Sequence, residues 1–181
     1  MTQPIQPPAL NMEDNIIPHG ASNRPGNHIT VTYITIHDTD NYDDGADARA
    51  NARYMLGADA RARQVSWHYT VDDHRCVRSL PDNEEGWHTA SHLGNMSSIG
   101  IETCVNAGID HDAANDRAAY LAAQLAKSHG VPIQNVVQHH HWISQTYPTG
   151  KDCPRYIRQT WPGGWERFIG QVTQYLQVLE V

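Results

Sequence analysis

Alternating apolar and polar positions predict a series of short strands along this chain. Residues 29–37 are β-branched and aromatic, which is typical of a strand. Ile34 and Ile36 point to one face of this strand, and Thr35 and His37 point to the other. His37 therefore stands where the strand gives way to a loop, a usual place for a ligand in α/β proteins.

Further strands are expected over residues 64–72, 75–80 and 98–105, and a short apolar run leads into His139. Within the strand over residues 98–105, Glu102 points away from the face that carries the isoleucines. Two chemically versatile side chains, a histidine and a glutamate, are thus predicted on strands of one sheet.

Helical periodicity appears in three segments. Residues 112–129 and 165–179 carry apolar side chains at every third or fourth position, which predicts helices with one core-facing stripe. Residues 43–63 are rich in alanine and arginine and are also expected to be helical. An aspartate of the pair Asp43–Asp44 is the expected N-cap, and Gly57 is expected to end or interrupt this helix.

Strands that alternate with helices indicate an α/β fold, with a central mixed β-sheet flanked by helices in a single domain. We predict that residues 29–181 form this domain. Residues 1–28 contain five prolines and are expected to form an irregular N-terminal arm packed on the body. Residues 81–95 are expected to be a loop.

Composition narrows the possible partners. The chain of 181 residues carries a formal net charge of −7, which argues against nucleic acid or an anionic surface as the main partner. No apolar run reaches the roughly 18 residues that a membrane span needs, so membrane insertion is not expected. The N-terminus has neither a basic start nor an apolar core, and three cysteines do not indicate a disulfide framework. We therefore expect synthesis in the cytoplasm without a signal peptide.

The densest chemistry lies in residues 135–154. This segment holds a run of three histidines that begins at His139, followed by Lys151 and Cys153. Prolines and glycine indicate a loop, and imidazole and thiolate groups on such a loop are what a zinc site uses. Surface histidines and a packing cysteine are the plain alternative for this segment taken alone.

The combination with the earlier strands is more specific than any one motif. His37, His139 and Cys153 would give zinc two imidazoles and one thiolate, leaving a fourth position for water. Glu102 could take a proton from that water, and Lys151 could stabilise an oxyanion. These residues by themselves indicate metal-assisted hydrolysis of an unspecified bond.

Five stretches occur in the same order in a known family: YITIHDT, QVSWHYTVDD, GWHTA, MSSIGIETCVN and VVQHHHW with GKDCP. On these stretches the chain resembles the zinc-dependent N-acetylmuramoyl-L-alanine amidases of type 2, which share a fold with peptidoglycan recognition proteins and many phage endolysins. The resemblance covers roughly residues 15–170. It implies one zinc ion per chain and hydrolysis of the amide between N-acetylmuramic acid and L-alanine in peptidoglycan.

The resemblance also implies a role for single residues. His37, His139 and Cys153 match the zinc ligands, Glu102 matches the catalytic glutamate, and Lys151 matches the lysine that helps to stabilise the transition state.

Three further residues are candidates for contact with the substrate. Trp67 falls where relatives carry an aromatic residue that lines the site, and Trp87 and His88 are the other substrate-cleft candidates. Simple packing is the alternative for all three.

The chain departs from the family pattern at residues 143–149, which look like an insertion before Lys151. This departure leaves the choice among the three histidines open. If the run continues a strand, His139 and His141 point to one side and His140 to the other. His141 is then the main competitor for the metal, and His140 a weaker one.

The expected biological role is a lytic amidase, a phage or prophage endolysin that reaches the wall through a membrane lesion and works as a monomer. A non-catalytic peptidoglycan-binding module of the same fold and a cytosolic amidase that recycles wall fragments are the alternatives within the family. A cysteine hydrolase that uses Cys153 with a histidine is the alternative outside it.

Overall fold

The computed structural model describes residues 5–180 and is built on a six-stranded mixed sheet. Along the sheet the order is β1-β4-β3-β5-β2-β6, and the β3–β4 pair is antiparallel while the other pairs are parallel. The strands are β1 (Met12–Asp14), β2 (Tyr33–Asp38), β3 (Tyr69–Val71), β4 (Cys76–Arg78), β5 (Ser98–Thr103) and β6 (Val136–Gln138). This is the flanked mixed sheet that the alternation of strands and helices predicts.

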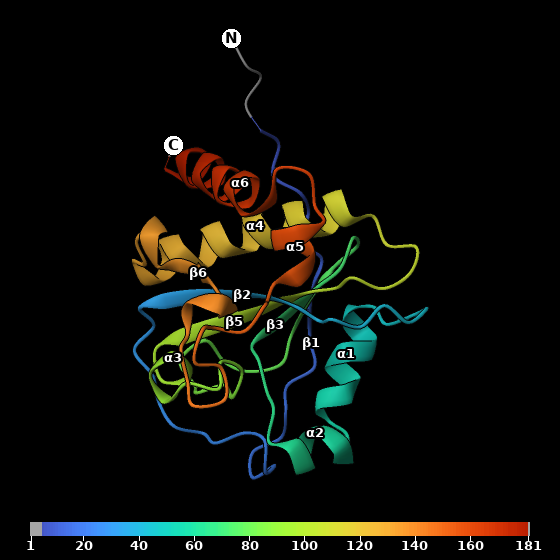
Figure 1. Cartoon of the computed structure of the whole chain (residues 1–181), viewed down its shortest axis with the longest axis vertical. Helices are drawn as coiled ribbons and strands as arrows, with labels where there is room; N and C mark the ends of the chain where they lie inside the picture. The colour runs from blue at the N-terminus through green and yellow to red at the C-terminus, as the bar shows by residue number, and fades with distance from the viewer. Residues whose placement is uncertain (1–4, 181) are drawn as a thin grey trace.

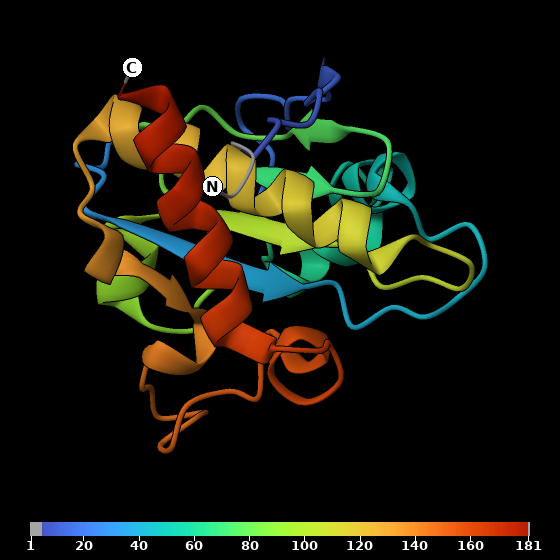
Figure 2. The same ribbon diagram turned by 90° about the horizontal axis from the view of Figure 1, so that it is seen from above.

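Helices cover both faces of the sheet (Figures 1 and 2). The long helices α4 and α6, with the short α5, lie on one face, and α1, α2 and α3 lie on the other. The helices are α1 (Ala48–Met55), α2 (Ala58–Arg63), α3 (His92–Asn95), α4 (His111–His129), α5 (Arg155–Gln159) and α6 (Gly164–Leu179), with 3₁₀ turns at η1 (Ile133–Asn135) and η2 (His139–His141).

The apolar core lies between the sheet and the α4–α6 layer. Ile34 and Ile36 of β2 and Ile99 and Ile101 of β5 are fully buried in one cluster with the apolar side of α4 and with Phe168 of α6. The predicted two-residue alternation on β2 and β5 is confirmed by this cluster. Its consequence is that the intervening residues of both strands face the opposite side of the sheet.

That opposite side is unusually polar for a sheet interior. Thr70, Glu102 and His37 are register partners across β3, β5 and β2, so their side chains project from the same face. Gly100 lies two residues before Glu102 and faces the same side of β5. Because it has no side chain, it leaves room above this strand. A polar, partly hollow layer therefore lies between the sheet and the α1–α3 side.

The segment 43–63 is two helices rather than one. Gly57 separates α1 from α2, as the sequence suggested, and Gln64 ends α2 in the left-handed conformation. The cap is not the Asp43–Asp44 pair, which was a wrong prediction. Asp47 caps α1 by accepting a hydrogen bond from the Ala50 amide at 2.7 Å, since the turn at Gly45 delays the start of the helix.

Several strands are shorter than predicted because their ends bond to loops. Ile29 and Thr32 donate to carbonyls of Asn83 and Ser97, so the ladder of β2 starts only at Tyr33. Residues 12–14, in the expected irregular arm, form β1 at the sheet edge, and residues 81–95, expected to be a loop, contain α3. Residues 1–4 of the arm lie outside the described residues, and the domain boundary at residue 28 stays a prediction.

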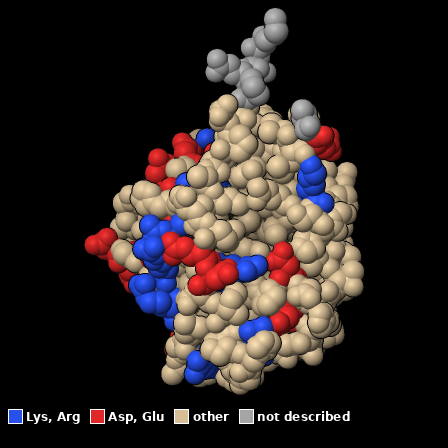
Figure 3. Space-filling view, turned by 180° about the vertical axis from the view of Figure 1, so that it is seen from behind, with Lys and Arg blue, Asp and Glu red and all other residues tan. Residues whose placement is uncertain are grey.

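Charges on the surface are mixed in sign. On the face seen from behind in Figure 3, basic and acidic side chains lie next to one another rather than in a patch of one sign. Arg49 and Arg78, for example, pair with Glu13 and Asp14 of β1. Over residues 5–180, the structure contains no helix with the length and apolar character to cross a bilayer.

The packing of β2 against α4 predicts that a smaller side chain in this layer lowers the free energy of unfolding. Ile34→Ala should lower the free energy of unfolding by about 3 kcal/mol, because it leaves a cavity in the central core. Leu93→Ala, at a leucine that is 67% exposed, is the control and should change stability by less than about 0.5 kcal/mol. Chemical denaturation of both variants measures the difference, and equal losses would contradict this description of the core.

Candidate metal centre

Three side chains that are distant in sequence converge at the carboxyl ends of β2 and β6. His37, His139 and Cys153 each offer a donor atom, and these atoms all lie within 4.8 Å of one another. All three residues are buried, with exposures of 1–3%. The parallel pairing of β2 with β6 aligns Ile36 with Gln138. The residues that follow them, His37 and His139, therefore lie side by side.

Cys153 is brought in by the loop between η2 and α5. Its carbonyl accepts a hydrogen bond from the His140 amide at 3.0 Å, and the Lys151 carbonyl lies 3.0 Å from Nδ1 of His140. Gly150 has a positive φ of 83°, and a Cβ there would lie 2.2 Å from the His140 carbonyl oxygen. Glycine is therefore required for this close approach, which leaves Cys153 Sγ 3.8 Å from Nδ1 of His37.

The donor atoms of this cluster are arranged to bind a metal ion rather than to hydrogen-bond one another. Nδ1 of His139 and Oε2 of Glu102 are buried without a hydrogen-bond partner among the described residues. Unpaired buried polar atoms cost free energy unless something satisfies them. Two imidazoles and a thiol are a usual donor set for catalytic zinc, so the residues present fit this ion.

In His37 and His139 the hydrogen bonds away from the donor cluster are made by Nε2, which leaves Nδ1 of each ring free to face the cluster. Nε2 of His139 lies 3.1 Å from the Thr89 carbonyl oxygen, which can only accept, so the ring proton is on Nε2. Nε2 of His37 lies 2.9 Å from Nδ1 of His88. Both candidate ligands therefore have an outer partner on the segment 88–89.

Burial sets the charge states of the donors. It holds the pKa of His37 well below its ordinary value, with help from the nearby imidazoles, and lowers the pKa of His139 to about 4. Both rings are consequently neutral at physiological pH and can bind a metal. Burial, with the nearby carboxylates of Glu102 and Asp38, raises the pKa of the Cys153 thiol well above its ordinary value in the metal-free protein.

Glu102 lies at the edge of the donor cluster, on β5. Its Oε1 is 3.8 Å from Nδ1 of His37, too long for a hydrogen bond but close enough to face the same space. Burial and the neighbouring Asp38 raise the pKa of Glu102 well above its ordinary value, and Lys151 partly opposes the rise. A largely buried carboxyl group beside the metal donors is a candidate for proton transfer.

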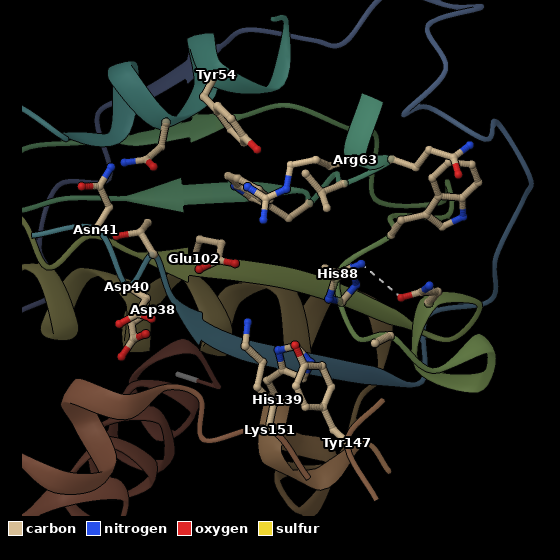
Figure 4. Close-up of a pocket in the computed structure, with 18 of the residues that line it drawn as sticks. Asp38, Asp40, Asn41, Tyr54, Arg63, His88, Glu102, His139, Tyr147 and Lys151 are labelled. Atoms are coloured by element: carbon tan, nitrogen blue, oxygen red, sulfur yellow. Dashed lines mark hydrogen bonds between the residues drawn. The ribbon is translucent and has the colours of Figure 1, made fainter. Parts of the chain in front are cut away.

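Lys151 and Tyr147 form the opposite wall of the cavity. In Figure 4 the Lys151 side chain projects towards the space below Glu102, alongside His139 and Tyr147. The ammonium lies 5.9 Å from the centre of the Tyr147 ring, which in turn packs edge-on against His139 at 6.2 Å. The segment 143–149, which looked like an insertion, thus supplies part of the site.

The other two histidines of the run lie away from the cluster. The run forms the 3₁₀ turn η2 instead of continuing a strand, so the expectation that His139 and His141 share a side is wrong. His141 is exposed and packs against the rings of Tyr33 and Trp142. The turn forms because Trp142 bonds back to the His139 carbonyl and its Nε1 donates to Thr35 Oγ1 at 2.9 Å.

A cleft of about 960 Å³ opens over these groups. Trp67, Trp87 and His88 line it, together with Glu102, His139 and Lys151. Trp67 is largely buried and donates from Nε1 to Thr70 Oγ1 at 2.7 Å, while Trp87 Nε1 donates to Glu85 at 3.1 Å. Their place in the cleft is compatible with substrate contact, which stays a prediction.

Sequence reasoning missed several residues that line this cleft. Tyr147 had a signal, an aromatic residue in a polar loop just before Lys151. Tyr54 and Arg63, on α1 and α2, had none, because helical periodicity does not tell which polar face borders a cavity. Figure 4 places both side chains on the wall opposite His139 and Lys151.

Comparison with known proteins agrees with this geometry. The chain matches the family described as N-acetylmuramoyl-L-alanine amidase over residues 27–156. The chain belongs to this amidase family. It is 44% identical over 154 residues to the N-acetylmuramoyl-L-alanine amidase XlyA of Bacillus subtilis (strain 168), which covers 84% of this chain and 49% of XlyA. Identity to the amidase CwlH of the same organism is 37% over 155 residues, covering 84% of this chain and 58% of CwlH.

Solved structures show the same fold. The catalytic domain of XlyA superimposes with a TM-score of 0.79 at 41% identity, covering 90% of this chain and 99% of that domain. A mutant endolysin from Bacillus subtilis gives a TM-score of 0.80 at 39% identity, covering 91% of this chain and 99% of that one. The type 2 amidase fold is therefore confirmed. The chain spans about half the length of the curated relatives that it matches.

Replacing His139 and His141 in turn tests which of the two histidines binds the metal. His139→Ala should reduce bound zinc from about one ion per chain to a small fraction of that, because it removes a buried donor. His141→Ala should leave the zinc content unchanged, because that ring faces solvent. Elemental analysis of both purified variants decides the matter, and zinc loss in the His141 variant would reverse the assignment.

Proposed function

We propose that this chain is a zinc-dependent amidase that hydrolyses the bond between N-acetylmuramic acid and L-alanine of peptidoglycan. The observation that carries the proposal is the convergence of His37, His139 and Cys153 beside Glu102, next to an open cleft that His139 and Glu102 line. Family membership supports the bond class, since the residues alone indicate only hydrolysis.

His37, His139 and Cys153 would hold the zinc ion through Nδ1, Nδ1 and Sγ. When bound there, zinc would lower the pKa of a water molecule and polarise the carbonyl of the scissile amide. A closed four-ligand structural site would leave no room for water. Here three protein donors converge beside a cleft that His139 lines, an arrangement that leaves a fourth position open as catalytic sites do.

Glu102 is the proposed general base. Its Oε2 is buried without a partner among the described residues, so it is free to accept a proton from the attacking water. Once it holds that proton, Glu102 can donate it to the peptide amine as the amine leaves. Proton transfer in both directions therefore needs no second carboxylate.

Lys151 is proposed to stabilise the negative charge that develops on the carbonyl oxygen. Its side chain reaches into the cleft from the loop that also carries Cys153, and the Lys151 carbonyl lies 3.0 Å from Nδ1 of His140. A well-placed donor of this kind contributes on the order of 3 kcal/mol to transition-state stabilisation. Trp67 and Trp87 are proposed to contact the glycan or the peptide stem.

The proposed biological role is that of an endolysin acting on the cell wall after release through a membrane lesion. Likeness to an endolysin of Bacillus subtilis supports this role over recycling of wall fragments. The presence of Cys153 among the donors favours catalysis over a binding-only module of the same fold.

Replacing Glu102 should separate catalysis from metal binding. Glu102→Gln should keep about one zinc ion per chain yet lower the rate of wall lysis at least 100-fold, the usual contribution of a general base. The assay is release of new N-terminal L-alanine from purified peptidoglycan, measured with zinc content on the same sample. Glu166→Gln, on the exposed side of α6, is the matched control and should lyse normally.

A Glu102→Gln variant with wild-type activity would remove the glutamate from the mechanism. Wild-type protein that holds zinc but releases no L-alanine termini would favour the binding module. Activity that survives a chelator, in protein shown to be free of zinc, would favour a cysteine hydrolase instead.

Zinc uptake at pH 6 should release about one more proton per chain from the wild type than from Cys153→Ala, because metal binding requires a deprotonated thiolate. The low pKa of His37 and of His139 means that neither ring carries an extra proton at this pH. The Cys153 thiol, with its raised pKa, is protonated before binding and becomes a thiolate. Titration calorimetry in buffers of different ionisation enthalpy counts the proton.

In the same titration, Cys153→Ala provides the reference, because its other groups near the metal are unchanged. Equal proton release from the two proteins would mean that the thiol is not a ligand.

A further inference from the structure

His88 lies directly behind the candidate ligand His37. Nδ1 of His88 is 2.9 Å from Nε2 of His37, and Nε2 of His88 is 3.3 Å from the carbonyl oxygen of Ser98. A carbonyl oxygen only accepts hydrogen bonds, so the proton of the neutral His88 ring is on Nε2. Nδ1 of His88 is then an acceptor, and the proton between the two rings belongs to Nε2 of His37.

This chain of hydrogen bonds determines which nitrogen of His37 is free. With the proton on Nε2, the lone pair of His37 is on Nδ1, the atom that lies 3.8 Å from Cys153 Sγ. The opposite tautomer would place a proton on Nδ1, among the metal donors, and leave two lone pairs facing each other between the rings. His88 therefore selects the tautomer of His37 that can bind a metal.

The ring of His88 is itself tightly held. The ring packs so closely against β5 that a Cβ at Gly100 would lie 2.8 Å from its Nδ1. A Cβ at Gly86 would approach the rings of both His68 and His88, at 3.0 and 3.2 Å. His68 packs edge-on against His88 at 5.8 Å and accepts the Gly100 amide at 3.0 Å. Glycines in GWHTA and SIGIE thus make the space that the ring occupies.

One loop serves both candidate histidine ligands. His88 bonds His37 through its side chain, and the next residue, Thr89, bonds His139 through its carbonyl oxygen. Asn95 Oδ1 fixes this pair by accepting from the amides of His88 and Thr89, at 3.1 and 2.9 Å. The two rings are therefore oriented by adjacent residues that share a single anchor, and Figure 4 shows His88 on the same side of the cleft as this anchor.

We propose that His88 is a positioning residue of the metal centre, which fixes the tautomer and the ring orientation of His37. This assigns His88 a role different from substrate contact. The inference rests on the metal site of the proposed function, and the experiment below separates the failure of the two.

The test compares two replacements of His88. His88→Asn retains an acceptor near the position of Nδ1, whereas His88→Leu has similar bulk and no acceptor. His74→Leu, at a histidine whose side chain is 72% exposed, is the control. Zinc affinity is measured by competition with a chelating dye, and the Co²⁺-substituted proteins are compared by their absorption spectra.

His88→Leu should weaken zinc binding about 10- to 100-fold, the usual effect of removing the partner of a ligating histidine. It should also change the Co²⁺ spectrum, while His88→Asn should recover most of the affinity and the wild-type spectrum. Wild-type affinity in His88→Leu would overturn the inference. So would equal weakness in both variants, because that result would mean that only the packing of the imidazole matters.

A direct observation on the wild type does not depend on how the variants fold. Nitrogen chemical shifts of the histidine rings in the zinc-loaded protein should show His37 bound through Nδ1 and protonated on Nε2, with His88 protonated only on Nε2. Coordination of His37 through Nε2, or a His88 ring protonated on both nitrogens, would overturn the inference. A wild-type protein that binds no zinc would instead overturn the metal site itself.

Discussion

The parallel pairing of β2 with β5 and β6 is the constraint on which the rest of the site depends. It brings the carboxyl ends of three strands together, and with them His37, Glu102 and His139. The isoleucines on the other face of β2 and β5 are buried against α4 and α6 and fix this register, because a slip of one residue would exchange the core for the polar face. The same alternation that builds the core therefore aims the side chains of the candidate site.

The polar face is costly to bury, and the structure reduces that cost in two ways. Backbone carbonyls and amides satisfy the imidazoles of His68, His88 and His139 from outside the cluster. Nδ1 of His139 has no hydrogen-bond partner among the described residues, and it lies in the donor cluster, where a cation would satisfy it. A metal ion would thus contribute to stability as well as to chemistry, since it binds the folded chain and not a dispersed set of ligands.

Much of this arrangement could be predicted from the sequence. Strand alternation predicted the faces of Ile34, His37 and Glu102, and helical periodicity predicted α4 and α6, because each depends on local repeats that burial reinforces. The conformation of the histidine run could not be predicted in this way. Whether His139 to His141 form a strand or a turn depends on Trp142 reaching Thr35 across the sheet, a contact between distant parts of the chain.

The role of His88 was hidden for the same reason. A histidine beside a tryptophan in a loop resembles a substrate-binding residue, and only the tertiary structure shows its Nδ1 beside His37. Tyr147 was likewise placed at the site by the turn from Ser144 to Tyr147, whose backbone and side-chain bonds are not visible as a periodic pattern.

The proposed zinc ion would be held by the imidazoles of His37 and His139 and the thiolate of Cys153. X-ray absorption at the zinc edge of the loaded protein tests this ligand set most directly. The account predicts one sulfur at about 2.3 Å with nitrogen or oxygen neighbours at about 2.0 Å in a four-coordinate shell. A shell without sulfur would contradict the account, because Cys153 would then lie outside the metal site.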